Sequence, residues 1–203
     1  MAETTPSFTV TINDGAKGAA PAQPVPEPAS KAMTWTNGKQ TVKYTTTAEL
    51  LPLHTDDGEL IGHMFALSYV SDEKDKTDRP VTFCWNGGPG GSSAMVNIGG
   101  LGPRRVPINS LRQLPCPTAP EDNPYSLLPT TDLVYLDAMG TGYSQVAKDY
   151  DPKKVWGVDG DADAFMRGIA QWLTAHERWN TPLYLYGESY GTMRNSVLMR
   201  VLG

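Results

Sequence analysis

The stretch Leu183-Tyr184-Leu185-Tyr186-Gly187-Glu188-Ser189-Tyr190-Gly191 decides the fold of this chain. A short apolar run precedes the pattern G-x-S-x-G, and residues 192–202 follow it with helical composition and spacing. Glycines on both sides of the serine let a strand turn sharply into a helix, so that the serine side chain projects from the end of the sheet. The stretch therefore predicts a strand, a tight turn and a helix, with Ser189 as a candidate nucleophile.

Earlier parts of the chain supply the strands and the helix that such a unit needs. Residues 159–179 carry apolar side chains every three or four positions, which predicts an amphipathic helix. Asp56-Asp57-Gly58 has the composition of a hairpin turn. Strands are predicted at residues 41–47, 60–70, 81–85 and 133–136. The order strand, helix, strand, turn, helix is typical of an α/β fold with a parallel sheet.

The chain is predicted to form one folded domain behind a flexible tether. Residues 1–34 are rich in proline and alanine and favour an extended conformation without a packed core. Residues 35–203 are long enough to bury one core, since chains of ~150 residues already bury about 70% of their unfolded surface. We therefore place the domain boundary at residue 35.

Composition excludes several classes of function. The net charge is −5, and no stripe of Lys and Arg with interleaved aromatic residues is present, so nucleic acid is not an expected partner. No apolar run approaches the ~20 residues of a membrane span. Met1 to Pro6 lack the basic and apolar regions of an export signal, which predicts a cytoplasmic protein as written, and a secreted or periplasmic one if the start site is misassigned. Cys84 and Cys116 have no metal-ligand spacing and are interpreted as free thiols.

A glycine-rich loop follows the predicted strand 81–85. Residues 86–93 read Asn-Gly-Gly-Pro-Gly-Gly-Ser-Ser, with four glycines in five positions. In hydrolases with a G-x-S-x-G turn, a glycine-rich loop after an early strand gives one oxyanion N–H group, and the residue after the nucleophile, here Tyr190, gives the other. Phosphate binding is the alternative for such a loop, but neither G-K-[ST] nor G-x-G-x-x-G with a downstream acidic residue is present.

Five sequence blocks occur in the order in which the serine carboxypeptidase family carries them, and the chain resembles a bacterial-type member of that family. The blocks are Asn86-Gly87-Gly88-Pro89-Gly90-x-Ser92-Ser93, Leu101-Gly102-Pro103, Asn123-Pro124-Tyr125-Ser126, Leu136-Asp137 with Gly140-Thr141-Gly142-Tyr143-Ser144, and Gly187-Glu188-Ser189-Tyr190-Gly191. The resemblance implies an α/β-hydrolase fold, with a mostly parallel sheet and helices on both faces.

The resemblance also implies roles for individual residues. Ser189 corresponds to the nucleophile, and the N–H groups of Gly88 and Tyr190 correspond to the oxyanion hole. Asn86 and Glu188 match positions that bind the terminal carboxylate of the substrate, which Glu188 can do as a hydrogen-bond donor only when it is protonated. The implied substrates are peptide or protein C-termini, and neither a metal nor an organic cofactor is implied.

The chain departs from the family pattern at two positions beside these blocks. Cys84 stands where the well-known eukaryotic members place a Trp, and Gly100 stands where they place a second Glu. A proton shared between paired carboxylates is therefore not expected here, which puts an acid pH optimum and strict exopeptidase behaviour in question.

The general base is not found at the expected place. In this fold the acid and the His follow the nucleophile, whereas residues 190–203 contain no Asp, Glu or His. His54, His63 and His176 all precede Ser189. His63 is assigned to an edge strand and His176 to the apolar side of a helix, and both are interpreted as structural. A His–Asp–Ser order that uses Asp137 would need a different fold, and Asp137 has a simpler interpretation as a turn residue at a strand end.

The sequence therefore predicts the N-terminal half of a serine carboxypeptidase, an incomplete fold that is nearly inactive alone. Leu183 to Tyr186 would then form an uncovered apolar edge. Two alternatives stay open: an esterase or acyltransferase on the same scaffold, and a non-catalytic fragment that binds peptides without turnover.

Overall fold

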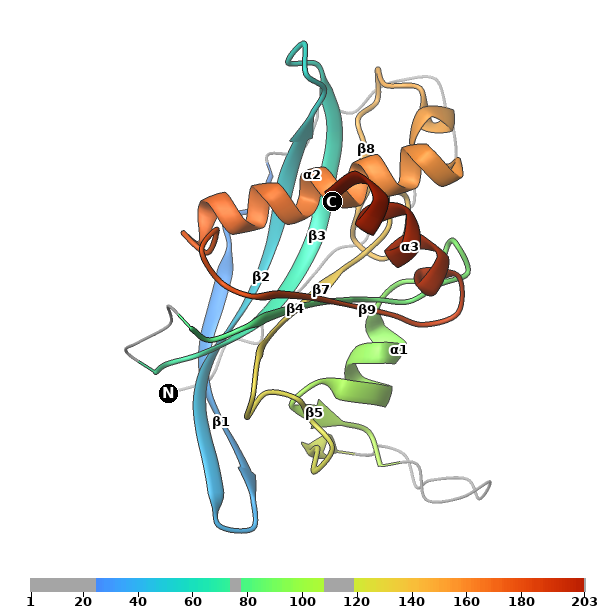
Figure 1. Ribbon diagram of the computed structural model, residues 1–203. Coiled ribbons are helices and arrows are strands. Elements are labelled where there is room, and N and C mark those ends of the chain that lie inside the picture. The colour runs from blue at the N-terminus through green and yellow to red at the C-terminus, as the bar shows by residue number, and fades with distance from the viewer. Residues whose placement is uncertain (1–24, 74–77, 108–118, 203) are drawn as a thin grey trace, which may run out of the picture.

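The computed structural model describes residues 25–73, 78–107 and 119–202, which form an α/β fold around one twisted, mixed sheet (Figure 1). Seven strands make this sheet, in the order β1-β2-β3-β7-β4-β9, with β8 paired to β3. Their bounds are β1 (Ala29–Asn37), β2 (Gln40–His54), β3 (Leu60–Ser71), β4 (Val81–Trp85), β7 (Asp132–Leu136), β8 (Gln145–Val146) and β9 (Leu183–Gly187). The sequence prediction of an α/β fold is confirmed.

The N-terminal part of the sheet is antiparallel. Strands β1, β2 and β3 follow one another through short turns, and such turns can join only antiparallel neighbours. Gly38 (φ +59°) and Gly58 (φ +86°) occupy left-handed positions in the two turns, and the second is the hairpin turn that the sequence predicted. The sequence predicted a mostly parallel sheet, but only β7, β4 and β9 pair in parallel. Strands β1, β2, β3 and β8 pair antiparallel.

Strands β7, β4 and β9 form the parallel part, with β4 in the middle. Longer segments connect these strands, and α2 (Val158–Ala175) lies on the connection from β7 to β9. Val81 pairs with Leu183 at one end of β4 and Trp85 pairs with Gly187 at the other. The carboxyl ends of all three strands consequently open onto the same edge of the sheet, where ligand sites of α/β folds are found.

Helices cover both faces of the parallel part. In Figure 1, α2 and α3 (Tyr190–Leu202) lie above β4 and β9, whereas α1 (Ala94–Val96) lies below them. The π-helix η1 (Asn97–Leu101) continues α1, and the 3-10 helix η2 (Pro152–Val155) precedes α2. A second sheet pairs β5 (Arg104–Arg105) with β6 (Glu121–Asp122). No helix within the described residues is long and apolar enough to cross a bilayer.

Alternate side chains of the buried strands fill two cores, one on each face. Phe83 and Trp85 point toward α2, where their rings meet Trp172 and Phe165 edge-on at centroid distances of 5.6 and 5.0 Å. Cys84 points to the opposite face, among aromatic residues of the β-hairpins and Val96 of α1. Strands β4 and β7 are buried along their whole length, as a parallel strand between two helical layers must be.

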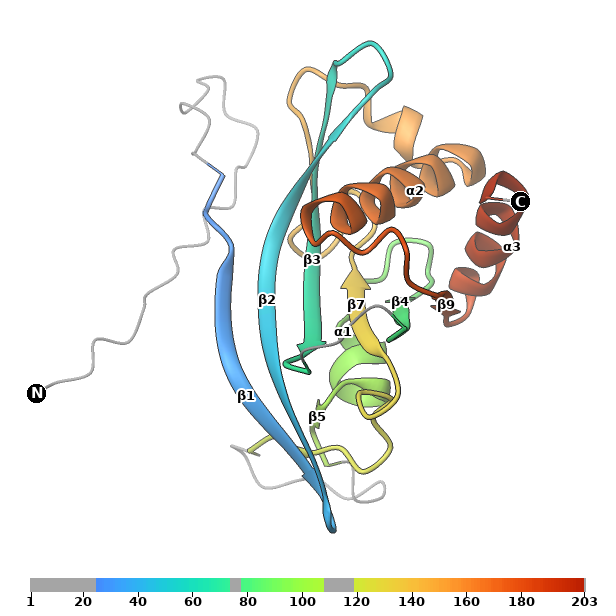
Figure 2. The same cartoon turned by 60° about the vertical axis from the view of Figure 1, so that its left-hand side comes forward.

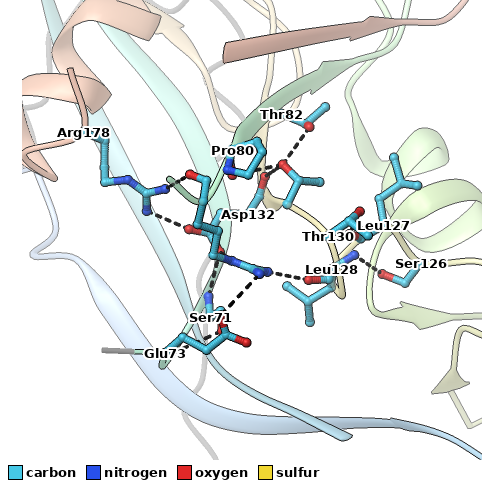
Figure 3. A network of polar contacts seen from close by, with 12 residues as sticks. Ser71, Glu73, Pro80, Thr82, Ser126, Leu127, Leu128, Thr130, Asp132 and Arg178 are labelled. Carbon is cyan, nitrogen blue, oxygen red and sulfur yellow. Dashed lines mark hydrogen bonds and ion pairs between the residues drawn. The ribbon is translucent and has the colours of Figure 1, made fainter. Parts of the chain in front are cut away.

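A buried ionic network closes the edge of the sheet opposite to the carboxyl ends (Figure 3). Asp132 is the first residue of β7, and its carboxylate has no exposed surface. The carboxylate accepts hydrogen bonds from Arg79 Nε at 2.8 Å and from Arg178 Nη1 at 2.6 Å. It also accepts from the Ser71 backbone N–H at the end of β3. Arg178 donates in addition to the Arg79 carbonyl. One carboxylate thereby joins the segments around β3, β4, β7 and the end of α2.

Strand β1 corrects the predicted domain boundary. It begins at Ala29, so residues 29–34 belong to a strand and not to a flexible tether. This strand is exposed along most of its length and therefore lacks the apolar alternation that would have revealed it. The remainder of the predicted tether, residues 1–24, lies outside the described residues.

One further expectation about strands needs correction. Leu183 to Tyr186 form a strand as predicted, and β9 is largely exposed, as expected of an uncovered edge, with a neighbour on one side only within the described part of the chain. His63 was assigned to an edge strand, whereas β3 lies inside the sheet between β2 and both β7 and β8. Cys84 is a free thiol as predicted, and Cys116 lies outside the described residues.

Candidate functional site

Ser189 lies in a strained turn between β9 and α3, on the edge where the parallel strands end. Its φ of +55° falls in the left-handed region, which costs an L-residue roughly 1–2 kcal/mol. The flanking glycines are required sterically, because a Cβ on Gly187 would overlap the Gly191 carbonyl and one on Gly191 would lie 2.8 Å from Trp85 Cδ1. Ser189 itself is exposed. This is the geometry of a nucleophile elbow.

The glycine-rich loop after β4 packs directly against this elbow. Gly87 is buried, and a Cβ there would lie 2.5 Å from the Tyr190 nitrogen and 2.9 Å from Ser189 Cβ. The Gly87 carbonyl accepts from the Gly91 N–H at 2.9 Å. Because a trans peptide is planar, the Gly88 N–H points to the side opposite to that carbonyl. Gly88 has φ +114°, a conformation that glycine alone adopts readily.

Asn86 and Glu188, which the sequence pairs only by resemblance, are in contact. Asn86 Nδ2 donates to Glu188 Oε2 at 3.1 Å. Asn86 Oδ1 accepts from the Val96 N–H at 2.9 Å, and this bond fixes which end of the amide faces Glu188. The pair therefore presents a fixed amide donor and an exposed carboxyl group immediately beside Ser189.

The segment after β7 supports the far end of the glycine-rich loop. Asp137 Oδ1 accepts from the Ser93 N–H at 2.7 Å, and the Asp137 carbonyl accepts from Ser144 Oγ at 2.8 Å. Burial raises the pKa of Asp137, while hydrogen bonds from Ser93 and Tyr143 oppose that rise. Asp137 thus acts as a buried turn residue at a strand end, as the sequence predicted.

Sequence reasoning missed a buried ion pair behind the elbow. Arg194, in the second turn of α3, meets the Asp161 carboxylate through Nε at 2.6 Å and Nη2 at 3.1 Å. Its remaining nitrogen, Nη1, donates to the Asn86 carbonyl at 3.0 Å. Asp161 lies in the first turn of α2, where the helix dipole alone would account for an acidic residue. A buried pair formed by residues 33 positions apart leaves no periodic signal in the sequence.

Two of the three histidines lie in structural surroundings. His176 Nε2 is 2.7 Å from Glu49 Oε1, and its ring stacks on Trp172 at the end of α2. His63 lies within β3, where burial and the nearby His54 lower its pKa. His54 ends β2, and its carbonyl accepts from Arg167. The surroundings of His63 and His176 fit their structural interpretation, whereas the His54 side chain is exposed.

The hydrogen bonds of Ser189 within the described residues involve its backbone. Its carbonyl accepts from the N–H of Thr192 at 3.0 Å and from Thr192 Oγ1 at 2.8 Å. None of the side-chain bonds found in residues 25–73, 78–107 and 119–202 joins the Ser189 hydroxyl to a histidine or a carboxylate. The same residues hold no cluster of three metal-ligating side chains.

The structure also shows the surroundings of Cys84 and Gly100, the two positions that depart from the family pattern. Cys84 is fully buried in β4, and burial raises the pKa of its thiol, which keeps it protonated and unreactive. Gly100 lies in the π-helix η1, where its carbonyl accepts from Asn123 Nδ2 and a Cβ would meet only the Met95 carbonyl at 3.8 Å. A Cβ at this position would therefore make only an ordinary van der Waals contact.

Comparison with known proteins agrees with this arrangement. No curated protein shows a significant similarity to the chain. A family model, however, described as serine carboxypeptidase, matches residues 38–198, which are most of the chain and include the glycine-rich loop and the elbow. On this match and the geometry of its elbow, the chain belongs to the serine carboxypeptidase family.

Proposed function

We propose that the chain carries the acyl-transfer half of a serine carboxypeptidase site, with Ser189 as the nucleophile. Ser189 Oγ would attack the last peptide carbonyl of a substrate, the C–N bond would break with proton transfer to the leaving amine, and water would release the acyl group. The observation that carries this proposal is the Asn86–Glu188 contact beside the strained serine, because a pair of this kind suits a substrate's C-terminal carboxylate.

Two backbone N–H groups are suited to stabilise the oxyanion. The Tyr190 N–H lies at the first turn of α3, where the helix dipole is positive and the N–H has no partner within the helix. The Gly88 N–H is directed away from Gly91 and belongs to the loop that packs on the elbow. Each such donor contributes a factor of ~10²–10³ in known sites.

Carboxylate recognition would use Asn86 as a donor and Glu188 in its protonated form. The Val96 N–H holds the Asn86 amide so that its NH₂ group faces outward toward Glu188. A free carboxylate has two oxygens and can accept a hydrogen bond from each group. A C-terminal amide has only one accepting oxygen and cannot accept from both groups in the same way. The site should therefore discriminate between free and amidated peptide ends.

The test compares two peptides that differ only in a free or an amidated C-terminus. We expect binding to the free acid at least about tenfold tighter than to the amide, since a hydrogen bond to a charged group is worth roughly 1.5–3 kcal/mol. Asn86→Ala should reduce this ratio, and Lys39→Ala, on the exposed β1–β2 turn, should not. Equal affinity of wild type for both peptides would contradict the carboxylate role.

One observation favours a second candidate, a peptide-binding protein without turnover. No histidine contacts the Ser189 hydroxyl within the described residues, and a triad serine without its base retains only ~10³–10⁴-fold acceleration over water. This candidate predicts carboxylate-dependent peptide binding with no acylation of Ser189. An esterase or acyltransferase would instead acylate Ser189 without preference for a free peptide carboxylate.

A further inference from the structure

The geometry points to Arg194 as a positioning residue of the site, which sets the orientation of the glycine-rich loop through the Asn86 carbonyl. This inference rests on the proposed function of the Ser189 site and adds a part to it. Arg194 lies four residues after Tyr190 on α3, so both residues share one face of that helix. Its side chain points inward and has no exposed surface.

Arg194 is held in a single place by contacts on three sides. Two of its nitrogens meet the two oxygens of Asp161, which leaves the guanidinium plane little freedom. The Phe165 ring lies 4.0 Å from Cζ, and the rings of Tyr190 and Trp85 lie 5.5 and 6.0 Å from it. A fork held in this way has one direction left for Nη1, toward the loop.

The group that Nη1 meets is the first carbonyl beyond the β4–β9 pairing. The Glu188 N–H donates to the Trp85 carbonyl at 3.1 Å, which closes the contact between the two strands. The next carbonyl, of Asn86, has passed the end of that ladder and accepts from Arg194 at 3.0 Å. A buried guanidinium thus supplies the partner that the ladder no longer provides.

Fixing this carbonyl also fixes the peptides that follow it. Since the Asn86–Gly87 peptide is planar, Arg194 determines the direction of the Gly87 N–H, and the Gly91 N–H determines the next peptide unit. The N–H of this next peptide unit, Gly87–Gly88, belongs to Gly88, the proposed oxyanion donor. Asn86 also carries the amide that faces Glu188. Arg194 therefore acts directly on Asn86 and, through the adjoining Gly87 peptide that the Gly91 N–H also holds, on Gly88, without contacting the substrate.

A purely structural role for Arg194 is the alternative, and Arg178 provides a matched control. Arg178 is likewise buried and paired with a buried carboxylate, Asp132, and also donates to a backbone carbonyl. It lies at the opposite edge of the sheet from Ser189. Arg194→Met and Arg178→Met should therefore both lower the melting temperature, whereas only Arg194→Met should disturb the site.

The experiment measures two properties in wild type, Arg194→Met, Arg194→Lys and Arg178→Met. The first is the rate of Ser189 labelling by a fluorophosphonate, and the second is amide hydrogen exchange at Gly91 and Val96, whose N–H groups donate to Gly87 and Asn86. We expect Arg194→Met to slow labelling about tenfold or more, since small displacements of a reacting group are costly. Exchange at both amides should become at least about tenfold faster.

Arg194→Lys separates charge from orientation. A lysine keeps the ion pair with Asp161, but its ammonium lacks the planar fork that reaches Asn86 at the same time. We expect its melting temperature to stay nearer to that of wild type than that of Arg194→Met, while labelling remains slow. Recovery of wild-type labelling in Arg194→Lys would overturn the positioning role.

The outcomes distinguish this inference from the proposed function. Unchanged exchange at Gly91 and Val96 in Arg194→Met, or an equal change in Arg178→Met, overturns the role of Arg194 even if Ser189 is a nucleophile. Absence of labelling in wild type contradicts the proposed catalytic function. Faster exchange confined to Arg194→Met would in that case still support the role of Arg194 in holding the loop.

Discussion

At the scale of single residues, Ser189 combines a backbone strain with an exposed side chain. A non-glycine residue at φ +55° is held in this conformation by its surroundings. Here these are the Trp85 side chain and the two flanking glycines, neither of which has room for a Cβ. Trp85 Nε1 donates to the Gly191 carbonyl at 3.2 Å and so helps to hold the turn. Backbone strain at an exposed polar residue is typical of functional sites, where a side chain is held in a required orientation although this lowers the stability of the fold.

We expect Ser189→Gly to stabilise the fold. Glycine adopts the left-handed conformation without the cost that an L-residue bears there, so the free energy of unfolding should rise by about 1 kcal/mol relative to Ser189→Ala. Urea unfolding of the two variants measures this difference. If Ser189→Gly is no more stable than Ser189→Ala, the turn is not strained at this residue.

His63 gives a prediction about pH. Burial, and then the charge of His54, lower its pKa below the usual 6.5. NMR titration of the imidazole should show this depression, and His54→Gln should remove part of it while burial maintains the rest. An unchanged His63 pKa in His54→Gln would exclude the charge of His54 as a cause.

The sign of the effect on stability follows from the lowered pKa. Below about pH 6.5 the unfolded chain binds a proton at His63 more readily than the folded chain does, so this group destabilises the fold as pH falls. His63→Gln should make the loss of unfolding free energy between pH 7 and pH 5 shallower. An equal slope in wild type and His63→Gln would contradict this account.

At the scale of elements, the contact between the glycine-rich loop and the elbow is tested by adding one methyl group. A Cβ on Gly87 would lie 2.5 Å from the Tyr190 backbone nitrogen, which cannot move without moving α3. Gly87→Ala should therefore lower the free energy of unfolding by about 1–3 kcal/mol and slow Ser189 labelling.

Gly90→Ala is the control for Gly87→Ala, because a Cβ at residue 90 meets nothing nearer than 3.9 Å. It belongs to the same loop and should leave the free energy of unfolding and the labelling rate close to those of wild type. Equal effects of the two substitutions would show that the loop does not pack on the elbow as described.

The network around Asp132 predicts a large loss of stability from a change of one atom. Asp132→Asn leaves Arg79 and Arg178 buried without their carboxylate, and breaking a buried pair in this way costs about 3–5 kcal/mol. Asp163→Asn, on the partly exposed pair with Arg167, should cost less than about 1 kcal/mol. Urea unfolding compares them, and similar losses would contradict the structural weight of Asp132.

The elements that the sequence predicted well are those with a strong local pattern. Residues 81–85 form a strand with the predicted bounds because a mostly apolar run lies between Pro80 and the glycine-rich loop. Strand β1 was missed because its side chains are mostly exposed and need no apolar alternation. The short helices α1 and η1 follow a glycine-rich loop and depend on tertiary contacts, such as those of Asn97 with Tyr69.

The candidate site shows the same division. The pattern G-x-S-x-G identifies Ser189 because the turn requires glycines at fixed places, and these glycines are visible in the sequence. The contact between Asn86 and Glu188 was implied by resemblance alone, since 102 residues separate them. Arg194 was missed because its role depends on contacts with Asp161, Phe165 and Asn86, which come together behind the elbow only in the folded chain.

At the scale of the whole molecule, the site exists only when the sheet is assembled. The glycine-rich loop follows β4, Asp137 follows β7 and Ser189 follows β9, and parallel pairing brings these three strand ends to one edge. The antiparallel strands β1 to β3 extend the sheet on the other side of β7 (Figure 2). The reactivity of Ser189 should therefore be a property of the folded chain and disappear on unfolding.

The most direct test is to label the folded chain with a fluorophosphonate and analyse its tryptic peptides by mass spectrometry. Cleavage at arginine gives residues 179–194, in which Ser189 is the one serine. We predict modification of Ser189 at least about a hundredfold faster than in urea-unfolded chain, the acceleration expected from oxyanion donors alone, and none in Ser189→Ala. Equal labelling of folded and unfolded chain, or unmodified residues 179–194 in the folded chain, would contradict a nucleophilic Ser189.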